Sequence, residues 1–179
     1  MKTILLVLLL SLTTCSLFSE WTHLGLSNHF VLDLTIYEEY LYAATDNGIY
    51  KKNIDQEDTL WVHLGLEEQY VNCLTVLNHE TIIAGMSFLN SEHPILRTDN
   101  GGILWYPFSE GIDPDDFYFQ TLSIDYHPET PHIIFSTGIS YVLRLIEPSN
   151  IWELVAGDWS MIALGYHFVK IHPEHPNLI

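Results

Sequence analysis

Two aspartates stand where a carboxylate could take part in acid–base chemistry. Asp33 interrupts the apolar run 30–36, and Asp125 lies near the end of the run 119–126. Glycoside hydrolysis needs two carboxyl groups at a defined separation, one of them protonated. A structural role is the alternative, because such side chains also cap strand ends or accept hydrogen bonds from backbone N–H groups. Asp33 and Asp125 are therefore the candidate catalytic residues, and the sequence assigns no reaction to either.

The ten histidines do not form a metal-binding pattern. Those that recur between similar segments, such as His23 and His63, are expected to lie in neighbouring structural units rather than around one ion. His172 and His175 could chelate together, but no cluster of three ligands with a known spacing surrounds them. The acidic loop 113–116 lacks the alternating spacing and the glycine of a calcium-binding EF-hand loop. We expect neither a metal nor another cofactor.

Cysteine chemistry is limited in the same way. Cys15 falls in the N-terminal leader described below, which leaves Cys73 alone in the mature chain. Neither an intrachain disulfide nor a cysteine zinc site can then form. Cys73 lies in the apolar run 71–76, and no basic neighbour is evident that would lower the pKa of its thiol, so we expect a buried core residue.

The elements that must position these residues belong to a repeat. The segment Trp61–Leu66 (WVHLGL) nearly copies Trp21–Leu26 (WTHLGL), which lies 40 residues earlier, and further repeats begin near Trp105 and Trp152. A self-similar period of this size indicates a repeat architecture. Each repeat contains short runs of β-branched and aromatic residues bounded by turn signals, such as Asn47-Gly48, whose positive φ angles suit a tight hairpin.

Four short strands in every 40 to 47 residues, with one tryptophan per repeat, predict an all-β protein. The specific prediction is a β-propeller of four-stranded antiparallel blades. The first strand of each blade should line the centre, and the tryptophan should open the outermost strand. We expect about three full blades plus the start of a fourth, a partial ring over residues 20–179. A sandwich of up-and-down strands with a chance echo is the alternative.

The first 19 residues have the character of a secretory signal peptide. Lys2 supplies a positive start, and Ile4–Leu10 is an unbroken apolar run that is too short to span a membrane. We therefore expect a secreted or cell-envelope protein. A lipid anchor on Cys15 is the less favoured alternative, because Thr14 stands where bacterial lipoboxes normally have Gly, Ala or Ser.

The charge of the chain limits its partners. The formal net charge is −17, from 6 basic and 23 acidic residues in a chain of 179. Phosphate backbones and anionic lipid surfaces are repelled by such a field, so nucleic acid is not an expected partner. A protein or a polysaccharide is the expected partner class, and no membrane span is expected.

One segment resembles a known motif. Thr98–Trp105 (TDNGGILW) resembles the Asp-box of BNR repeats, a Ser/Thr-x-Asp-x-Gly-x-Thr-Trp hairpin on the rim of neuraminidase-type propellers. In the eight-residue register, Asn100 takes the aspartate place and Leu104 the threonine place. If Asp99 is the box aspartate instead, Trp105 comes one residue late. The resemblance implies that the box is a folding device, with these structural residues: Thr98, Asp99, Asn100, Gly101, Gly102 and Trp105.

A second segment resembles related propellers. Ile124–Pro131 (IDYHPETP) looks like a turn of sortilin-like and xyloglucanase-like propellers, which are close in pattern to photosystem-assembly-factor-like propellers. Its His-Pro-Glu sequence, His127–Glu129, recurs at His172–Glu174, 45 residues later. The resemblance covers roughly residues 21–179 through the repeat pattern rather than through one diagnostic block.

The function implied by the resemblance depends on what the chain lacks. Sialidases hold the substrate carboxylate with three arginines, and this chain has only Arg97 and Arg144, so sialidase activity is rejected. The favoured interpretation is a secreted, non-catalytic propeller module that binds a protein or a glycan.

Two other interpretations stay open. The chain could be the N-terminal fragment of a secreted glycoside hydrolase of xyloglucanase-like type. A sortilin-like peptide receptor would need a cysteine-rich module that this chain does not show. The sequence stops where a second strand of the fourth blade should begin, so self-association or further C-terminal blades are expected to complete the ring.

Overall fold

The protein is built of β-strands. The computed structural model describes residues 23–56, 60–89, 91–112, 120–138, 141–157, 168–175 and 178, so the predicted signal peptide, Cys15 and Trp21 lie outside the described residues. These residues contain twelve strands and no helix. The strands are β1 Val31–Tyr37, β2 Tyr40–Thr45, β3 Gly48–Asn53, β4 Val62–His63, β5 Val71–Val76, β6 Thr81–Met86, β7 Ile95–Asp99, β8 Tyr106–Pro107, β9 Ser123–His127, β10 Thr130–Thr137, β11 Tyr141–Ile146 and β12 Glu153–Gly157.

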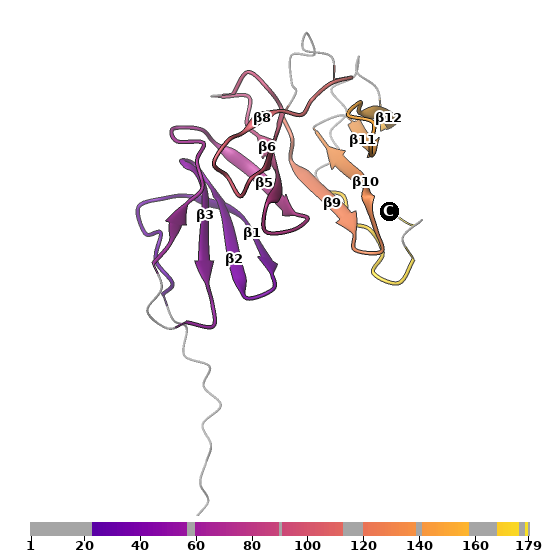
Figure 1. Cartoon of the computed structure of the whole chain (residues 1–179). Helices are drawn as coiled ribbons and strands as arrows, with labels where there is room; N and C mark the ends of the chain where they lie inside the picture. The colour runs from indigo at the N-terminus through magenta and orange to yellow at the C-terminus, as the bar shows by residue number, and fades with distance from the viewer. Residues whose placement is uncertain are drawn as a thin grey trace, which may run out of the picture.

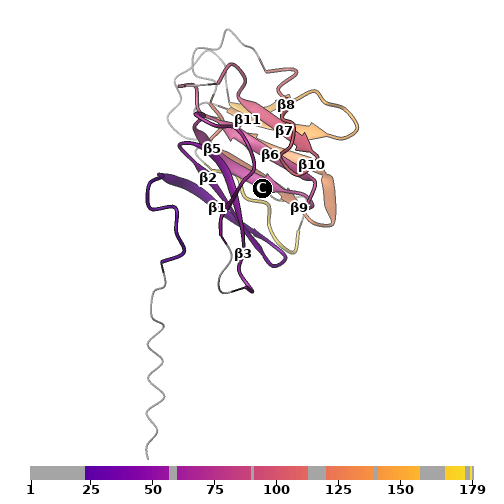
Figure 2. The ribbon, with the colours of Figure 1, turned by 60° about the vertical axis from the view of Figure 1, so that its left-hand side comes forward.

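The twelve strands form three separate sheets of four. Each sheet is a meander of consecutive antiparallel strands, in the orders β1-β2-β3-β4, β5-β6-β7-β8 and β9-β10-β11-β12. The two views place the second, magenta sheet between the indigo first sheet and the orange third sheet (Figure 1, Figure 2). The predicted all-β class with three complete four-stranded units is therefore confirmed, and the single sandwich is excluded.

The outermost strand of each sheet comes directly after a tryptophan, as predicted. β4, β8 and β12 follow Trp61, Trp105 and Trp152 and close the three sheets. Each indole N–H donates a hydrogen bond to a carbonyl oxygen that stands three residues after the tryptophan position of the preceding repeat. The donor–acceptor pairs are Trp61 to Leu24 at 2.7 Å, Trp105 to Leu64 at 2.8 Å and Trp152 to Phe108 at 2.7 Å.

The turn between β2 and β3 differs from its prediction. The pairing of Thr45 with Gly48 leaves Asp46 and Asn47 as the loop, and only Gly48 has a positive φ, of +87°. The Thr45 hydroxyl accepts a hydrogen bond from the Asn47 N–H at 3.0 Å and donates to the Gly48 carbonyl at 2.8 Å. The Thr45 hydroxyl therefore stabilises the turn together with one left-handed residue, Gly48, where two such residues, Asn47 and Gly48, were expected.

The sheets pack face to face through apolar side chains. Tyr42 and Ile49 of the first sheet meet Leu74 and Ile82 of the second in one buried cluster. A second cluster joins the second and third sheets, and its members include Ile83, Ile95, Ile124, Leu143 and Trp152. A third, smaller cluster joins the third sheet to the segment 168–171 through Phe135, Val142, Val169 and Ile171. Because each cluster lies between one sheet and the sheet or segment that follows it, the chain is stabilised one repeat against the next.

Candidate functional site

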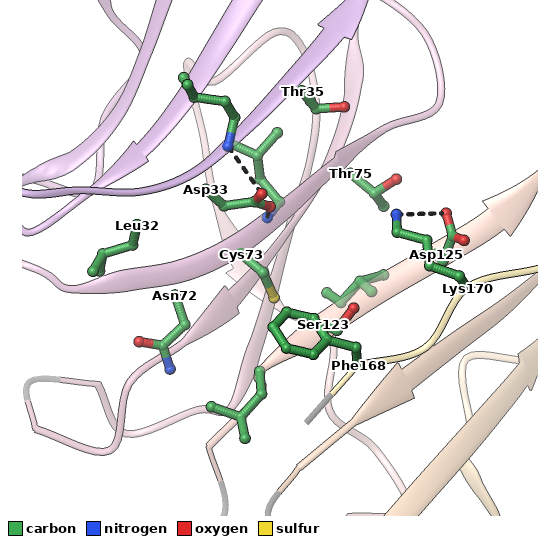
Figure 3. Close-up of a pocket in the computed structure, with 14 residues that line it drawn as sticks. Leu32, Asp33, Thr35, Asn72, Cys73, Thr75, Ser123, Asp125, Phe168 and Lys170 are labelled. Atoms are coloured by element: carbon green, nitrogen blue, oxygen red, sulfur yellow. Dashed lines mark hydrogen bonds and ion pairs between the residues drawn. The ribbon is translucent and has the colours of Figure 1, made fainter. Parts of the chain in front are cut away.

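The first strands of the three sheets meet around one cavity. A space of about 190 Å³ is lined by residues 32–35 of β1, residues 72–75 of β5 and residues 122–125 at β9, and Phe168 and Lys170 complete the lining (Figure 3). The first strand of each unit thus faces the centre, as the repeat predicted. Both candidate aspartates, Asp33 and Asp125, lie in this lining.

The Asp33 carboxylate joins the first sheet to the second. Its Oδ1 accepts a hydrogen bond from the N–H of Leu34 at 2.9 Å, and its Oδ2 accepts one from the N–H of Leu74 at 3.0 Å. Both oxygens are therefore used by the backbone, and the second bond crosses to the next repeat.

Asp125 makes the corresponding connection from the third sheet. Its Oδ2 accepts a hydrogen bond from the N–H of Ile171 at 2.9 Å, and its Oδ1 lies 3.6 Å from the Lys170 ammonium (Figure 3). Lys170 is largely exposed, so this ion pair contributes little stability. Like Asp33, Asp125 therefore binds a backbone N–H of the segment that follows its own sheet.

Cys73 lies on β5, the middle of the three strands that line the cavity. Burial raises the pKa of its thiol far above the usual range, and the nearby Asp33 carboxylate acts in the same direction. The Sγ atom lies 3.9 Å from the carbonyl oxygen of Thr121, and the residue is 4% exposed. The prediction of a buried core cysteine is confirmed, and a thiol that stays protonated is no nucleophile.

Two of the histidines stabilise turns of the backbone. His127 accepts a hydrogen bond at Nδ1 from the Glu129 N–H at 3.1 Å, and His172 accepts one from the Glu174 N–H at the same distance. The repeated His-Pro-Glu sequence is thus a repeated turn. Among the described residues, no group of three or more His, Cys, Asp or Glu side chains could hold a metal ion. The acidic loop 113–116 lies outside those residues.

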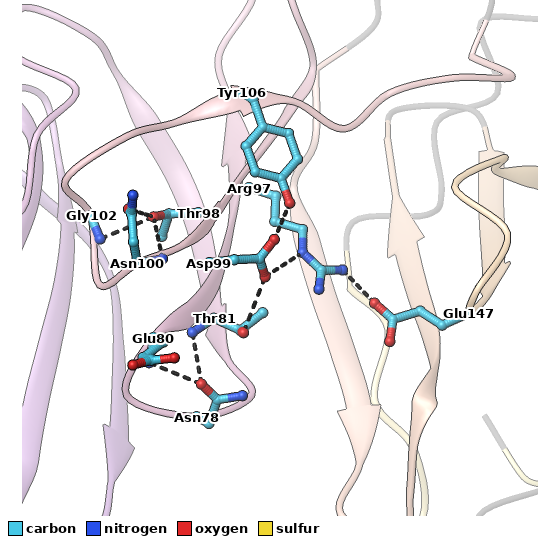
Figure 4. Close-up of polar contacts among 10 residues, drawn as sticks. All are labelled: Asn78, Glu80, Thr81, Arg97, Thr98, Asp99, Asn100, Gly102, Tyr106 and Glu147. Atoms are coloured by element: carbon cyan, nitrogen blue, oxygen red, sulfur yellow. Dashed lines mark hydrogen bonds and ion pairs between the residues drawn. The ribbon is translucent and has the colours of Figure 1, made fainter.

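The turn after β7 is held together by two side chains (Figure 4). The Thr98 hydroxyl accepts hydrogen bonds from the N–H groups of Asn100 at 3.3 Å and Gly102 at 3.0 Å, and it donates to Asn100 Oδ1 at 2.8 Å. The same Oδ1 accepts from the Leu104 N–H at 2.9 Å. Gly101 and Gly102 have φ angles of +69° and +96°, and a Cβ on Gly102 would lie 2.4 Å from the Leu64 carbonyl oxygen.

Asp99, which the resemblance groups with this turn, has other partners. Its carboxylate accepts hydrogen bonds from Tyr106, Arg97 and Thr81, and the Arg97 guanidinium also pairs with Glu147, which directly follows β11 of the third sheet (Figure 4). Burial opposes ionisation of Asp99, but the bonds from Tyr106 and Arg97 outweigh it and lower the pKa of the carboxyl group. Sequence reasoning missed the connection to Glu147, because nothing local relates two residues 50 positions apart.

Comparison with known proteins relates this arrangement to solved structures. No protein-family model and no curated protein matches the sequence. An ancestral GH74 enzyme matches with a TM-score of 0.56 at 12% identity, over 71% of this chain and 18% of that one. The β-propeller domain of Myceliophteria thermophila Cps50 (Swd1) matches with a TM-score of 0.52 at 12% identity, over 71% of this chain and 43% of that domain's chain.

The architecture is a partial β-propeller. A GH74 enzyme of Niastella koreensis gives a similar match, with a TM-score of 0.51 at 14% identity, over 68% of this chain and 20% of that one. At such identities the likeness shows the fold alone. The three sheets are blades, and the chain spans about a fifth of the length of the GH74 enzymes that it matches. In the described part of the chain, no helix is long and apolar enough to cross a membrane.

Proposed function

We propose that this chain is a non-catalytic propeller module that binds a protein or glycan partner. The observation that carries the proposal is the use of both central carboxylates as connectors between blades. Asp33 bonds the backbone of the second blade, and Asp125 bonds the segment that follows the third. A glycosidase must leave one carboxyl group free to donate a proton and the other free to act on the sugar or on water.

The size of the cavity supports the same interpretation. The space that holds both aspartates has a volume of about 190 Å³, which is below the roughly 300 Å³ at which ligand pockets usually begin. An adjoining hollow of about 320 Å³ is lined by Leu32, Asn72, Leu122 and Phe168. The larger space therefore offers an amide and apolar side chains, which suit the binding of a sugar face or an apolar side chain.

The turn after β7 supports a finer assignment of the repeat. Asn100 Oδ1 accepts hydrogen bonds from the Thr98 hydroxyl and the Leu104 N–H, and Trp105 follows it at the spacing of an Asp-box in the eight-residue register. We assign Thr98–Trp105 as an Asp-box-type hairpin in which asparagine replaces aspartate, and we assign the chain to a BNR-like repeat on that basis. Residues 1–19 complete the proposal as a signal for export to the cell envelope or beyond.

A glycoside hydrolase fragment is the second candidate. One observation favours it, because Asp33 and Asp125 line the same cavity. In this alternative the missing part of the ring would enlarge the cavity and release one carboxylate from the backbone. The likeness to GH74 enzymes is compatible with both candidates.

Hydrolysis and stability measured on the same variants separate the two candidates. We expect the wild-type chain to release no reducing sugar from soluble polysaccharides, xyloglucan included. We expect Asp33→Asn to lower the free energy of unfolding by roughly 1 to 2 kcal/mol, because a charge-assisted bond to the second blade is weakened. Sugar release by the wild type that Asp33→Asn and Asp125→Asn both abolish, with unchanged unfolding free energies, would show that these are catalytic residues.

A further inference from the structure

One face of the first blade lacks the cover that its counterparts have. Leu34 and Ile36 alternate along β1 with Asp33 and Tyr37, which contact the second blade, so they lie on the opposite face, where they are 55% and 65% exposed. The equivalent residues of the second blade, Leu74 and Val76, are 3% and 4% exposed. The two pairs occupy the same places in their sheets, since Leu34 pairs with Ala43 in β2 as Leu74 pairs with Ala84 in β6.

The structure shows what normally lies on this face. Leu74 and Val76 are buried in the cluster that joins the second blade to the first, and Ile124 is buried against the second blade in the next cluster. Val169 and Ile171 repeat the arrangement on the third blade. The equivalent face is therefore covered by the preceding blade three times in succession. Among the described residues, only the face of the first blade that contains Leu34 and Ile36 is uncovered.

The other end of the molecule carries the complementary side. Along the segment 168–171, Val169 and Ile171 point into the third blade, while Phe168 is 81% exposed and the Lys170 side chain is 78% exposed. Phe168 lines the central cavity, with its ring near Cys73 and Ser123 (Figure 3). This alternation puts Phe168 and Lys170 on the side that, in each complete blade, contacts the blade that follows.

We infer that the Leu34–Ile36 face is a docking surface for a second copy of this chain, which inserts its Phe168 side. The contact repeats the packing that buries the equivalent face three times within the chain, so the two copies pack head to tail. Phe168 of one copy covers Leu34 and Ile36 of the next copy. The β1 strand of that next copy then closes the open side of the first copy's central cavity. The inference does not depend on the proposed binding function, because it concerns the mass of the protein alone.

Charge sets the conditions for this association. Each copy carries a formal charge of −17, so two copies repel each other at low ionic strength. The docking residues themselves are apolar, apart from Lys170, and their contact is driven by burial from water. Association should therefore strengthen as sodium chloride is added, whereas an association based on ion pairs would weaken.

The test is the mass of the intact chain in solution, measured by sedimentation equilibrium over a range of concentrations and salt. We expect reversible association of the wild type. Leu34→Lys with Ile36→Lys should weaken it by at least about a hundredfold, because two aliphatic contacts are lost and charges are placed in the interface. Phe168→Asp should do the same. Ile103→Lys is the matched control, because Ile103 is 87% exposed in the turn after β7, and it should associate like the wild type.

Mixing the two defective variants gives the decisive result. Each variant keeps one intact surface, so the mixture should form a one-to-one dimer that does not grow further. A wild type that stays monomeric at all concentrations and salt levels overturns the inference. So does a mixture that stays monomeric although the wild type associates, because the contact is then not head to tail. Leu34→Ser with Ile36→Thr, compared by near-ultraviolet circular dichroism, shows whether any loss comes from misfolding.

Discussion

Asp99 is the acceptor in a polar network that reaches from the second blade to the third. It receives hydrogen bonds from Arg97, Tyr106 and Thr81, and Arg97 carries the connection on to Glu147 in the third blade. Burial raises the pKa of Tyr106, and its bond to Asp99 raises it further, to about 12. The pKa of Asp99 is lowered, as described above. The two groups therefore stabilise the fold in a limited pH range.

Tyr106→Phe should reveal that range. Because the pKa of Asp99 is lowered by folding, its contribution is present above the unfolded value of about 4 and is lost as the pH falls through the folded value. The contribution of the neutral Tyr106 phenol is present below about 10, its unfolded value, and is lost as the pH rises toward about 12. The variant should be less stable than the wild type at neutral pH, and the difference should shrink as the pH falls through the acid range.

Tyr126→Phe is the matched control for this measurement. The Tyr126 hydroxyl donates to the carbonyl oxygen of Val76 at 2.9 Å, and a carbonyl does not titrate. Urea unfolding from pH 2 to pH 7, read by tryptophan fluorescence, should show a constant difference for Tyr126→Phe and a diminishing one for Tyr106→Phe. Equal pH dependence of the two variants would contradict the assignment.

At the scale of the elements, the hairpin after β7 is defined by Asn100. Its Oδ1 accepts bonds from the Thr98 hydroxyl and from the Leu104 N–H, and this brings Trp105 to its acceptor on the preceding repeat. Asn100→Ala removes both acceptor bonds in a half-exposed turn. We expect a loss of about 1 to 2 kcal/mol in the free energy of unfolding, whereas Asn100→Asp should stay close to the wild type. Urea titration of the three proteins measures this, and equal losses for Ala and Asp would argue against the acceptor role.

Much of the element scale was predictable from the sequence, because its causes are local. Alternating residues, turn signals and the tryptophan period predicted the strands, their order in each sheet and the burial of Cys73. The register of the Thr98–Trp105 turn was left between Asp99 and Asn100, since both fit within one residue. The backbone bond from Asp33 to Leu74 could not be derived, because it depends on how two sheets stack rather than on either strand. The same holds for Arg97 and Glu147.

At the scale of the whole molecule, net charge opposes folding. The chain carries −17, and most of the ion pairs between its described residues have an exposed partner, so these pairs contribute little. Raising sodium chloride from about 0.01 M to about 0.15 M shortens the screening length from roughly 30 Å to 8 Å and should raise the free energy of unfolding. Urea titration at a concentration where the protein is monomeric tests this. A decrease would mean that specific ion pairs outweigh the general repulsion.

The tryptophan bonds have a direction along the chain. In each pair the accepting carbonyl precedes the donating indole, by 37, 41 and 44 residues. During translation, the acceptor has therefore already been made when its tryptophan leaves the ribosome. Each new repeat can settle on a neighbour that is already in place, so the polypeptide can acquire its structure from the N-terminus onward while it is still being synthesised.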